Sequence, residues 1–216
     1  MRLVVDQIAG ERGGNTLFSH LSFTLEQGQG LIVTGANGSG KSTLLRVLAG
    51  LMRPSQGTVC FEGAHGQEAM TCHYLGVLNA MKDQLTVREN LSFWAAHLAL
   101  EERSETAQKP PRDDTPRGRD TLETALEAVC LPHVLDTPFG FLSTGQKRRV
   151  AIARLLAVHR PVWLVDEPTS GLDRASESLF ADIAKSYLAS GGILVAATHL
   201  PLGIDGLQQL HIGELA

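Results

Sequence analysis

The sequence has 216 residues, the size of one domain of ordinary length. Its 19 basic and 23 acidic residues give a formal net charge of −4 and a pI near 6.0, which excludes the broad positive field of a dedicated nucleic-acid binder. Hydrophobic residues make up 43 % of the chain, enough to bury a sizeable core, so wholesale disorder is excluded as well.

We expect a cytoplasmic protein without a membrane span. The longest stretch without a charged side chain, residues 186–204, is interrupted by two adjacent glycines and a proline, so we expect a buried strand at its apolar centre. The first ten residues include Arg2 and Asp6 and lack the apolar block of a signal peptide. The three cysteines are widely spaced, which indicates reduced thiols.

The first third of the chain is expected to form strands around one helix. Short apolar or β-branched runs bounded by glycines predict the strands. Residues 42–49 have a helical pattern that ends at Gly50. The expected strands are residues 3–5, 18–25, 31–34, 58–61 and 74–75.

The middle of the chain is expected to be helical. Apolar side chains recur at helical spacing in residues 86–100, 122–129 and 148–158. Between the first two segments, Glu101 to Asp120 is charged and rich in proline, so we interpret it as an exposed loop.

The last third alternates again, with strands expected at 162–165 and 193–197 and a helix at 176–188. Strands that alternate with helices indicate a parallel sheet covered on both faces, so the expected fold class is α/β. We expect a single domain, residues 1–216, with a helical subdomain of approximately residues 84–158 inserted into its core.

A phosphate-binding loop lies between an expected strand and an expected helix. Residues 35–42 match the pattern G-x-x-x-x-G-K-[ST], in which glycines let the backbone N–H groups face a phosphate. The helix that follows adds its positive end. Lys41 is expected to reach the β- and γ-phosphates, and Ser42 to offer its hydroxyl to Mg²⁺. The expected nucleotide-binding residues are Gly35, Ala36, Asn37, Gly38, Ser39, Gly40, Lys41, Ser42 and Thr43.

Two acidic residues, Asp166 and Glu167, follow the strand expected at 162–165. Ligands bind at the carboxyl ends of strands in open α/β sheets. P-loop enzymes hold Mg²⁺ with a P-loop Ser or Thr and a strand-end Asp, which makes Ser42 and Asp166 the expected metal ligands. Glu167 is a candidate for polarising an attacking water. The alternative interpretation of the pair is a solvated strand end.

A third motif, Leu-Ser-Thr-Gly-Gln at residues 142–146, precedes the helix expected at 148–158. Ser143 suits a helix N-cap, and Gly145 allows a backbone to approach an anion closely. The P-loop, this motif, the Asp-Glu pair, the Ser-Gly-Leu-Asp run at 170–173 and His199 follow one another in an order that resembles the ATP-binding cassette (ABC) ATPase family over nearly the whole chain.

This resemblance implies a P-loop NTPase core whose parallel sheet is joined by an N-terminal antiparallel β part and an inserted helical subdomain. It implies a homodimer with two molecules of ATP between the subunits, each held by one P-loop. Ser143, Gly145 and Gln146 of the opposite chain would meet that ATP, and Asp173 would organise the interface.

The resemblance also implies the catalytic residues. Glu167 would be the catalytic base, His199 would contact the γ-phosphate, and Lys41 would be the third catalytic residue. The bound species would be ATP and Mg²⁺. Arg12 stands where the family has an aromatic residue that stacks on adenine, and a guanidinium can also stack on a base.

Two further positions depart from the family pattern. Leu78 occupies the place of a glutamine that senses Mg²⁺ and couples to the membrane subunit, and Asn79 is a candidate substitute because a leucine side chain has no ligand atom. In the Leu-Ser-Thr-Gly-Gln motif, which corresponds to the family's signature motif, Thr144 stands at a position that is usually glycine-like.

Several segments narrow the resemblance to the ATPase subunits of bacterial cytochrome c maturation (Ccm) transporters, which handle haem. The segments are residues 16–25, 74–76, 85–91, 145–150 and 198–202. This implies a peripheral protein on the cytoplasmic face of the inner membrane that works with a CcmB-like permease, CcmC and CcmD. It implies neither nucleic-acid binding nor membrane insertion.

Two alternatives remain open, namely the ATPase subunit of another small-substrate ABC exporter and a soluble ABC ATPase outside transport. A P-loop kinase or GTPase is disfavoured, because the N-K-x-D guanine motif is absent and residues 142–146 have no purpose in a kinase. Cys72 and His73 do not form the C-x-x-C-H haem-attachment pattern.

Overall fold

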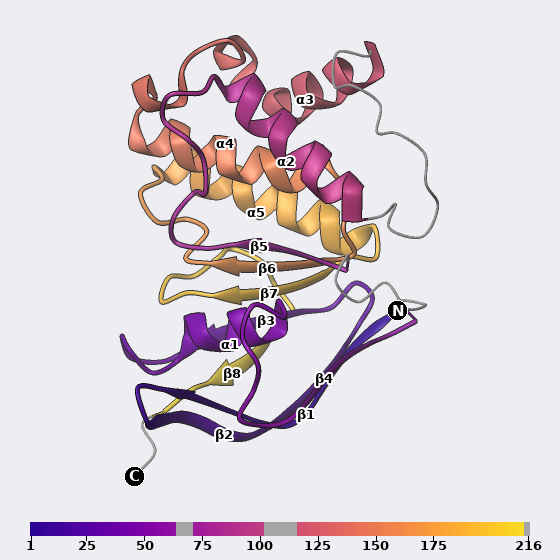
Figure 1. The fold of residues 1–216 in the computed structure, drawn as a ribbon, viewed down its shortest axis with the longest axis vertical. Helices are drawn as coiled ribbons and strands as arrows, with labels where there is room; N and C mark the ends of the chain where they lie inside the picture. The colour runs from indigo at the N-terminus through magenta and orange to yellow at the C-terminus, as the bar shows by residue number, and fades with distance from the viewer. Residues whose placement is uncertain (64–70, 102–115, 214–216) are drawn as a thin grey trace. The chain divides into compact units, whose positions relative to one another are not determined.

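A computed structural model describes residues 1–63, 71–101 and 116–213 (Figure 1). Its contacts divide the chain into two compact units. Unit 1 comprises Met1–Val77, Arg160–Pro168 and Ala184–Ala216, and unit 2 comprises Leu78–His159 and Thr169–Ile183. No helix among the described residues is long and apolar enough to cross a membrane.

Unit 1 contains a parallel sheet, as the sequence predicts, and this sheet has five strands. The order β5-β6-β7-β3-β8 places strands from distant parts of the chain side by side. β6 and β7 are buried along their whole length, which explains their continuous apolar runs. The strands are β3 (Gly30–Thr34), β5 (Cys72–Leu75), β6 (Val162–Asp166), β7 (Ile193–Ala197) and β8 (Gln208–His211).

Strand β8 was not predicted. Its sequence, Gln-Gln-Leu-His, is mostly exposed and has no apolar run, because it is an edge strand whose one partner among the described strands is β3. Pairing with β3 holds this segment in a strand, and such a tertiary interaction leaves no periodic signal in the sequence.

An antiparallel sheet with the order β2-β1-β4 completes unit 1. It consists of β1 (Arg2–Arg12), β2 (Asn15–Glu26) and β4 (Gln56–Glu62). Helix α1 (Lys41–Leu48) contacts β6 and β7 of the parallel sheet and β1 of the antiparallel sheet, so it lies between the two sheets (Figure 1). Its buried residues Leu44, Leu45 and Leu48 join the core there, which anchors the loop that precedes the helix.

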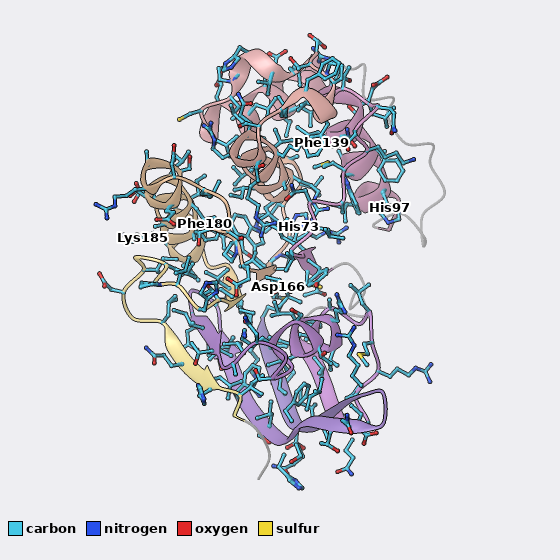
Figure 2. The ribbon with its side chains drawn as sticks, turned by 90° about the vertical axis from the view of Figure 1, so that its left-hand side faces the viewer. His73, His97, Phe139, Asp166, Phe180 and Lys185 are labelled. Atoms are coloured by element: carbon cyan, nitrogen blue, oxygen red, sulfur yellow. The ribbon has the colours of Figure 1, made fainter. Side chains whose placement is uncertain are left out.

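Unit 2 is helical. Its helices α2 (Val87–Glu101), α3 (Pro116–Ala128) and α4 (Thr144–Ala157) contact one another, and short 3₁₀ turns lie at Pro132–Val134 and Phe139–Phe141. Phe139 is 3 % exposed and lies inside this unit (Figure 2). Helix α5 (Arg174–Ala189) belongs to unit 2 up to Ile183.

The predicted bounds of the loop from Glu101 to Asp120 are wrong at both ends. Glu101 is the last residue of α2, and α3 begins at Pro116, so residues 116–120 are helical. Proline favours the first position of a helix, where no backbone N–H is needed, so the proline content of this segment does not exclude a helix that begins at Pro116. Residues 102–115 of the expected loop lie outside the described residues.

Candidate functional site

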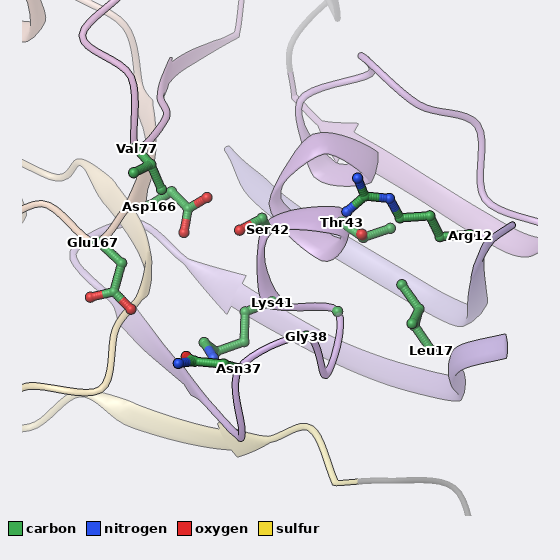
Figure 3. A pocket seen from close by; sticks show the side chains of 11 residues that line it. Arg12, Leu17, Asn37, Gly38, Lys41, Ser42, Thr43, Val77, Asp166 and Glu167 are labelled. Atoms are coloured by element: carbon green, nitrogen blue, oxygen red, sulfur yellow. The ribbon is translucent and has the colours of Figure 1, made fainter. Parts of the chain in front are cut away.

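A pocket of about 300 Å³ in unit 1 brings together residues from four separate parts of the chain. Figure 3 shows Asp166 and Glu167 on one side of the P-loop residues Lys41 and Ser42, with Arg12 and Leu17 on the other. The pocket is lined by Arg12, Leu17, Asn37, Gly38, Gly40, Lys41, Ser42, Thr43, Val77, Asp166 and Glu167.

The P-loop conformation requires glycine at two positions for different reasons. Gly40 has φ +107° directly before α1, and a Cβ there would lie 2.9 Å from Leu17 Cβ. Gly35 has φ +147°, and a Cβ there would lie 2.3 Å from the Ile212 carbonyl oxygen. Any other residue would meet both a disfavoured backbone conformation and a steric clash. The loop between these glycines leads into the N-terminus of α1, whose free N–H groups attract anions.

Lys41 is held against the backbone of its own loop. Its ammonium donates hydrogen bonds to the carbonyl oxygens of Gly35 at 2.8 Å and Ala36 at 2.9 Å, and the residue is only 8 % exposed. The cation therefore lies at the base of the P-loop and still lines the pocket. Ser39 is also buried, and its hydroxyl oxygen has no hydrogen-bond partner among the described residues.

Asp166 and Ser42 supply oxygen atoms to the same side of the pocket. Asp166 is the last residue of β6 and is 2 % exposed, and its carboxylate points toward Ser42 (Figure 3). A carboxylate and a hydroxyl are hard oxygen donors of the kind that Mg²⁺ prefers. Within the described ranges no group of three or more His, Cys, Asp or Glu side chains could hold a metal. Mg²⁺ that binds with a nucleotide usually takes phosphate oxygens among its ligands.

Glu167 lies in a turn directly after β6. Its φ of +46° is in the left-handed region that residues with a side chain seldom adopt, and its backbone N–H donates to the Ala197 carbonyl at 2.8 Å. The carboxylate has partners from the segment after β7: His199 Nδ1 lies 3.0 Å from Oε1, and the Thr198 hydroxyl lies 3.3 Å from Oε2. The fold therefore brings Glu167 and His199 together from positions 32 residues apart.

The signature residues belong to unit 2, where they begin helix α4. Ser143 is the N-cap, as the sequence predicts: its hydroxyl accepts from Gln146 N at 3.2 Å, and its own N–H donates to Gln146 Oε1 at 2.9 Å. This reciprocal capping box explains why both residues occur at this spacing. Ser143 is exposed, so the start of α4 is accessible.

Gly145 lies next to the Ser-Gly-Leu-Asp segment within unit 2. A Cβ on Gly145 would lie 3.5 Å from the Gly171 carbonyl oxygen, and a Cβ on Gly171 would lie 3.2 Å from Thr144 Cγ2. Asp173 caps α5, because its Oδ1 accepts from Ser176 N at 2.8 Å. Hydrogen bonds from Ser176 lower the pKa of Asp173 below its ordinary value.

The sequence did not single out three residues that line the pocket or contact Glu167. Leu17 and Val77 line the pocket as isolated apolar residues without a motif, and Thr198 was noted only as the neighbour of His199.

Leu78, at the position of the family's glutamine, is 84 % exposed in unit 2. The side-chain oxygen of its neighbour Asn79 accepts a hydrogen bond from the guanidinium of the buried Arg148 at 3.2 Å. This hydrogen bond ties Asn79 to helix α4, which contains Arg148.

Cys72 and His73 lie in strand β5. His73 is 3 % exposed (Figure 2), and Cys72 is half-buried. Burial of this kind suits residues of a sheet core.

Known proteins resemble this chain over almost its full length. The chain matches the ABC transporter family over residues 18–170. It is 51 % identical over 216 residues to the cytochrome c biogenesis ATP-binding export protein CcmA of Chelativorans sp. (strain BNC1), with 99 % of this chain and 98 % of that protein covered. The protein of the same name from Brucella abortus (strain 2308) is 52 % identical over 210 residues, with 95 % and 89 % covered.

The fold has relatives among solved structures as well. The structure of cbiO1 from Clostridium perfringens, part of the ABC transporter complex cbiONQ, matches with a TM-score of 0.72 at 26 % identity, with 92 % of this chain and 78 % of that chain covered. Because the family match spans most of the chain and the relatives match it nearly end to end, the chain belongs to the ABC transporter family and, within it, to the CcmA group of ATP-binding export proteins.

Proposed function

We propose that this chain is the ATP-hydrolysing subunit of an exporter that serves cytochrome c biogenesis, and that it works on membrane partners. The observation that carries the proposal is the convergence of Lys41, Ser42, Asp166 and Glu167 on one pocket, from segments more than 120 residues apart (166 − 42 = 124). Phosphate-binding groups, metal-binding oxygens and a carboxylate base are the three components that ATP hydrolysis requires.

The P-loop would hold the phosphates. The N-terminus of α1 and the backbone N–H groups of residues 35–42 provide donors, and Lys41 provides a full positive charge. Ser42 and Asp166 would hold Mg²⁺, which when bound neutralises charge on the β- and γ-phosphates. The far side of the pocket would take the nucleoside, with the Arg12 guanidinium stacked on the adenine and Leu17 in apolar contact.

Glu167 would act as the base. A water oxygen attacks the γ-phosphorus, the bond to the oxygen that bridges the β- and γ-phosphates breaks, and the proton of the water passes to the Glu167 carboxylate. The products are ADP and inorganic phosphate. His199, bound to Glu167 through Nδ1, would contact the γ-phosphate and link the base to the phosphoryl group that the water attacks.

A second copy of the chain would complete the site. The accessible start of α4, with Ser143, Gly145 and Gln146, is a helix N-terminus suited to an anion, and it would meet the γ-phosphate bound by the other copy. Asp173 would lie at the same interface. Closure of the dimer would then depend on ATP, and loss of the γ-phosphate would let the two copies separate.

The proposed cargo and partners rest on the relatives and on the sequence resemblance. The relatives are named as export proteins of cytochrome c biogenesis, which supports haem handling with a CcmB-like permease, CcmC and CcmD at the cytoplasmic face of the inner membrane. An exporter of another small substrate is the second candidate. Co-purification from solubilised membranes with the tagged full chain separates them, because recovery of an unrelated permease would refute the cytochrome c role.

The catalytic proposal is tested by Glu167→Gln. We expect the variant to bind ATP normally, to lose hydrolysis by at least about 100-fold, and to accumulate as an ATP-bound dimer. Phosphate release, nucleotide affinity and mass by light scattering measure the three effects. Glu123→Gln, at an exposed position on α3, is the matched control. Normal turnover by Glu167→Gln would show that Glu167 is not the base.

A further inference from the structure

A buried threonine lies directly before His199. Thr198 is 1 % exposed, and its backbone N–H donates to the Val33 carbonyl at 3.2 Å, which ties the end of β7 to β3. A buried hydroxyl needs hydrogen-bond partners, since leaving it without them costs about 1–3 kcal/mol. Its partners show what this side chain does.

Strand register explains why Thr198 meets Glu167. β6 and β7 are parallel neighbours in which Asp166 lies opposite Ala197. The residues that directly follow the two strands are therefore Glu167 after β6 and Thr198 after β7. Thr198 Oγ1 lies 3.3 Å from Glu167 Oε2, while His199 Nδ1 lies 3.0 Å from the other carboxylate oxygen. Consecutive residues of one segment thus contact the two oxygens of one carboxylate.

The hydroxyl of Thr198 also bonds to its own turn. It accepts from Leu200 N at 3.0 Å, and the Leu200 carbonyl oxygen lies 3.3 Å away. A hydroxyl has one proton, so it donates either to that carbonyl or to the carboxylate. The ionised carboxylate is the stronger acceptor, because charge-assisted hydrogen bonds are roughly twice as strong as neutral ones. The Leu200 N–H therefore fixes the hydroxyl oxygen, and the hydroxyl proton is available for donation to Glu167.

We infer that Thr198 is a positioning residue for hydrolysis. Its hydroxyl, held by the Leu200 N–H, and the His199 ring fix the rotation of the Glu167 carboxylate, so that one orientation of the base faces the attacking water. This inference rests on the proposed role of Glu167 as the base. Thr198 touches neither water nor nucleotide in this role and acts only through Glu167.

The test compares Thr198→Val, which keeps the branched shape and removes the hydroxyl, with Thr198→Ser, which keeps the hydroxyl. In the full chain we expect Thr198→Val to lower kcat about 10- to 100-fold, with the KM for ATP within about threefold of the unmodified protein. Thr198→Ser should restore most of the rate. A kcat of Thr198→Val within about twofold of the unmodified protein, or equal losses in both variants, would overturn the inference.

Controls separate this role from folding and from the proposed function. Melting temperatures report stability, and Thr58→Val, on an exposed position of β4, reports the effect of the same change elsewhere. If Thr198→Val folds poorly, Thr198→Ser and Thr198→Ala provide the same comparison, because they differ only in the hydroxyl.

In a Glu167→Gln background, Thr198→Val should lower the residual single-turnover rate no further. A full additional loss would mean that Thr198 acts elsewhere and would overturn the inference. Normal hydrolysis by Glu167→Gln alone would instead remove the proposed base, so the two failures are distinguishable.

Discussion

His199 Nδ1 lies 3.0 Å from Glu167 Oε1, and the His199 side chain is 62 % exposed while the Glu167 side chain is 17 % exposed. In the tautomer whose Nδ1 carries the hydrogen, the ring donates to this carboxylate oxygen. This leaves Nε2 for a second partner. The pair therefore links a largely shielded carboxylate to an exposed imidazole ring.

We expect His199→Ala to lower kcat about 10- to 100-fold and to leave ATP affinity nearly unchanged, because the ring orients the base and contributes little to binding in the ground state. Steady-state phosphate release and nucleotide titration measure the two effects. His133→Ala, at an exposed position in unit 2, should hydrolyse ATP at the normal rate. An unchanged kcat for His199→Ala would exclude the ring from the reaction.

Lys41→Ala should weaken ATP binding about 10- to 100-fold, since a charge-assisted hydrogen bond to phosphate is lost. Calorimetric titration with ATP measures the affinity directly. Lys185→Ala removes an exposed lysine of α5 and serves as the matched control for net charge. If both variants bind ATP equally well, the P-loop assignment fails.

Ser143 has a structural role and a proposed functional role, which two substitutions separate. Ser143→Ala removes the cap of α4 and should lower the free energy of unfolding by about 1 kcal/mol. Ser143→Asp restores a cap, but its negative charge would repel the γ-phosphate of a second copy. We therefore expect urea unfolding to recover in Ser143→Asp, while ATP-dependent dimerisation does not. Recovery of both would confine Ser143 to capping.

Tyr187 stacks on Trp163 in unit 1, with ring centroids 3.8 Å apart, and its hydroxyl donates to the Arg160 carbonyl at 2.9 Å. Burial raises the pKa of the Tyr187 phenol above its ordinary value of about 10. The phenol of the unfolded chain ionises first as the pH rises. Its contribution to stability is therefore complete below about pH 10 and is lost above it.

We expect unfolding experiments at rising pH to show this loss of stability above about pH 10, and Tyr187→Phe to reduce it. At neutral pH, Tyr187→Phe should lower the free energy of unfolding by about 0.5–1.5 kcal/mol, because one hydrogen bond is removed. The same alkaline slope in Tyr187→Phe would mean that other groups cause it.

The sequence by itself determined the features that are local along the chain. The P-loop is contiguous, so the strand, the glycines and the helix at residues 30–48 could be placed from their spacing, and Ser143 could be recognised as a helix cap. The apolar runs of β6 and β7 likewise predicted buried strands, because burial on both faces demands continuous apolar residues.

Only the tertiary structure decided which residues from separate segments contact one another. The parallel register of β6 and β7 places Glu167 beside Thr198 and His199, and no spacing in the sequence specifies that register. Strand β8 forms through pairing with β3, and Leu17 enters the pocket through folding of the antiparallel sheet. These contacts join distant segments, and their energies depend on neighbours that a local pattern does not contain.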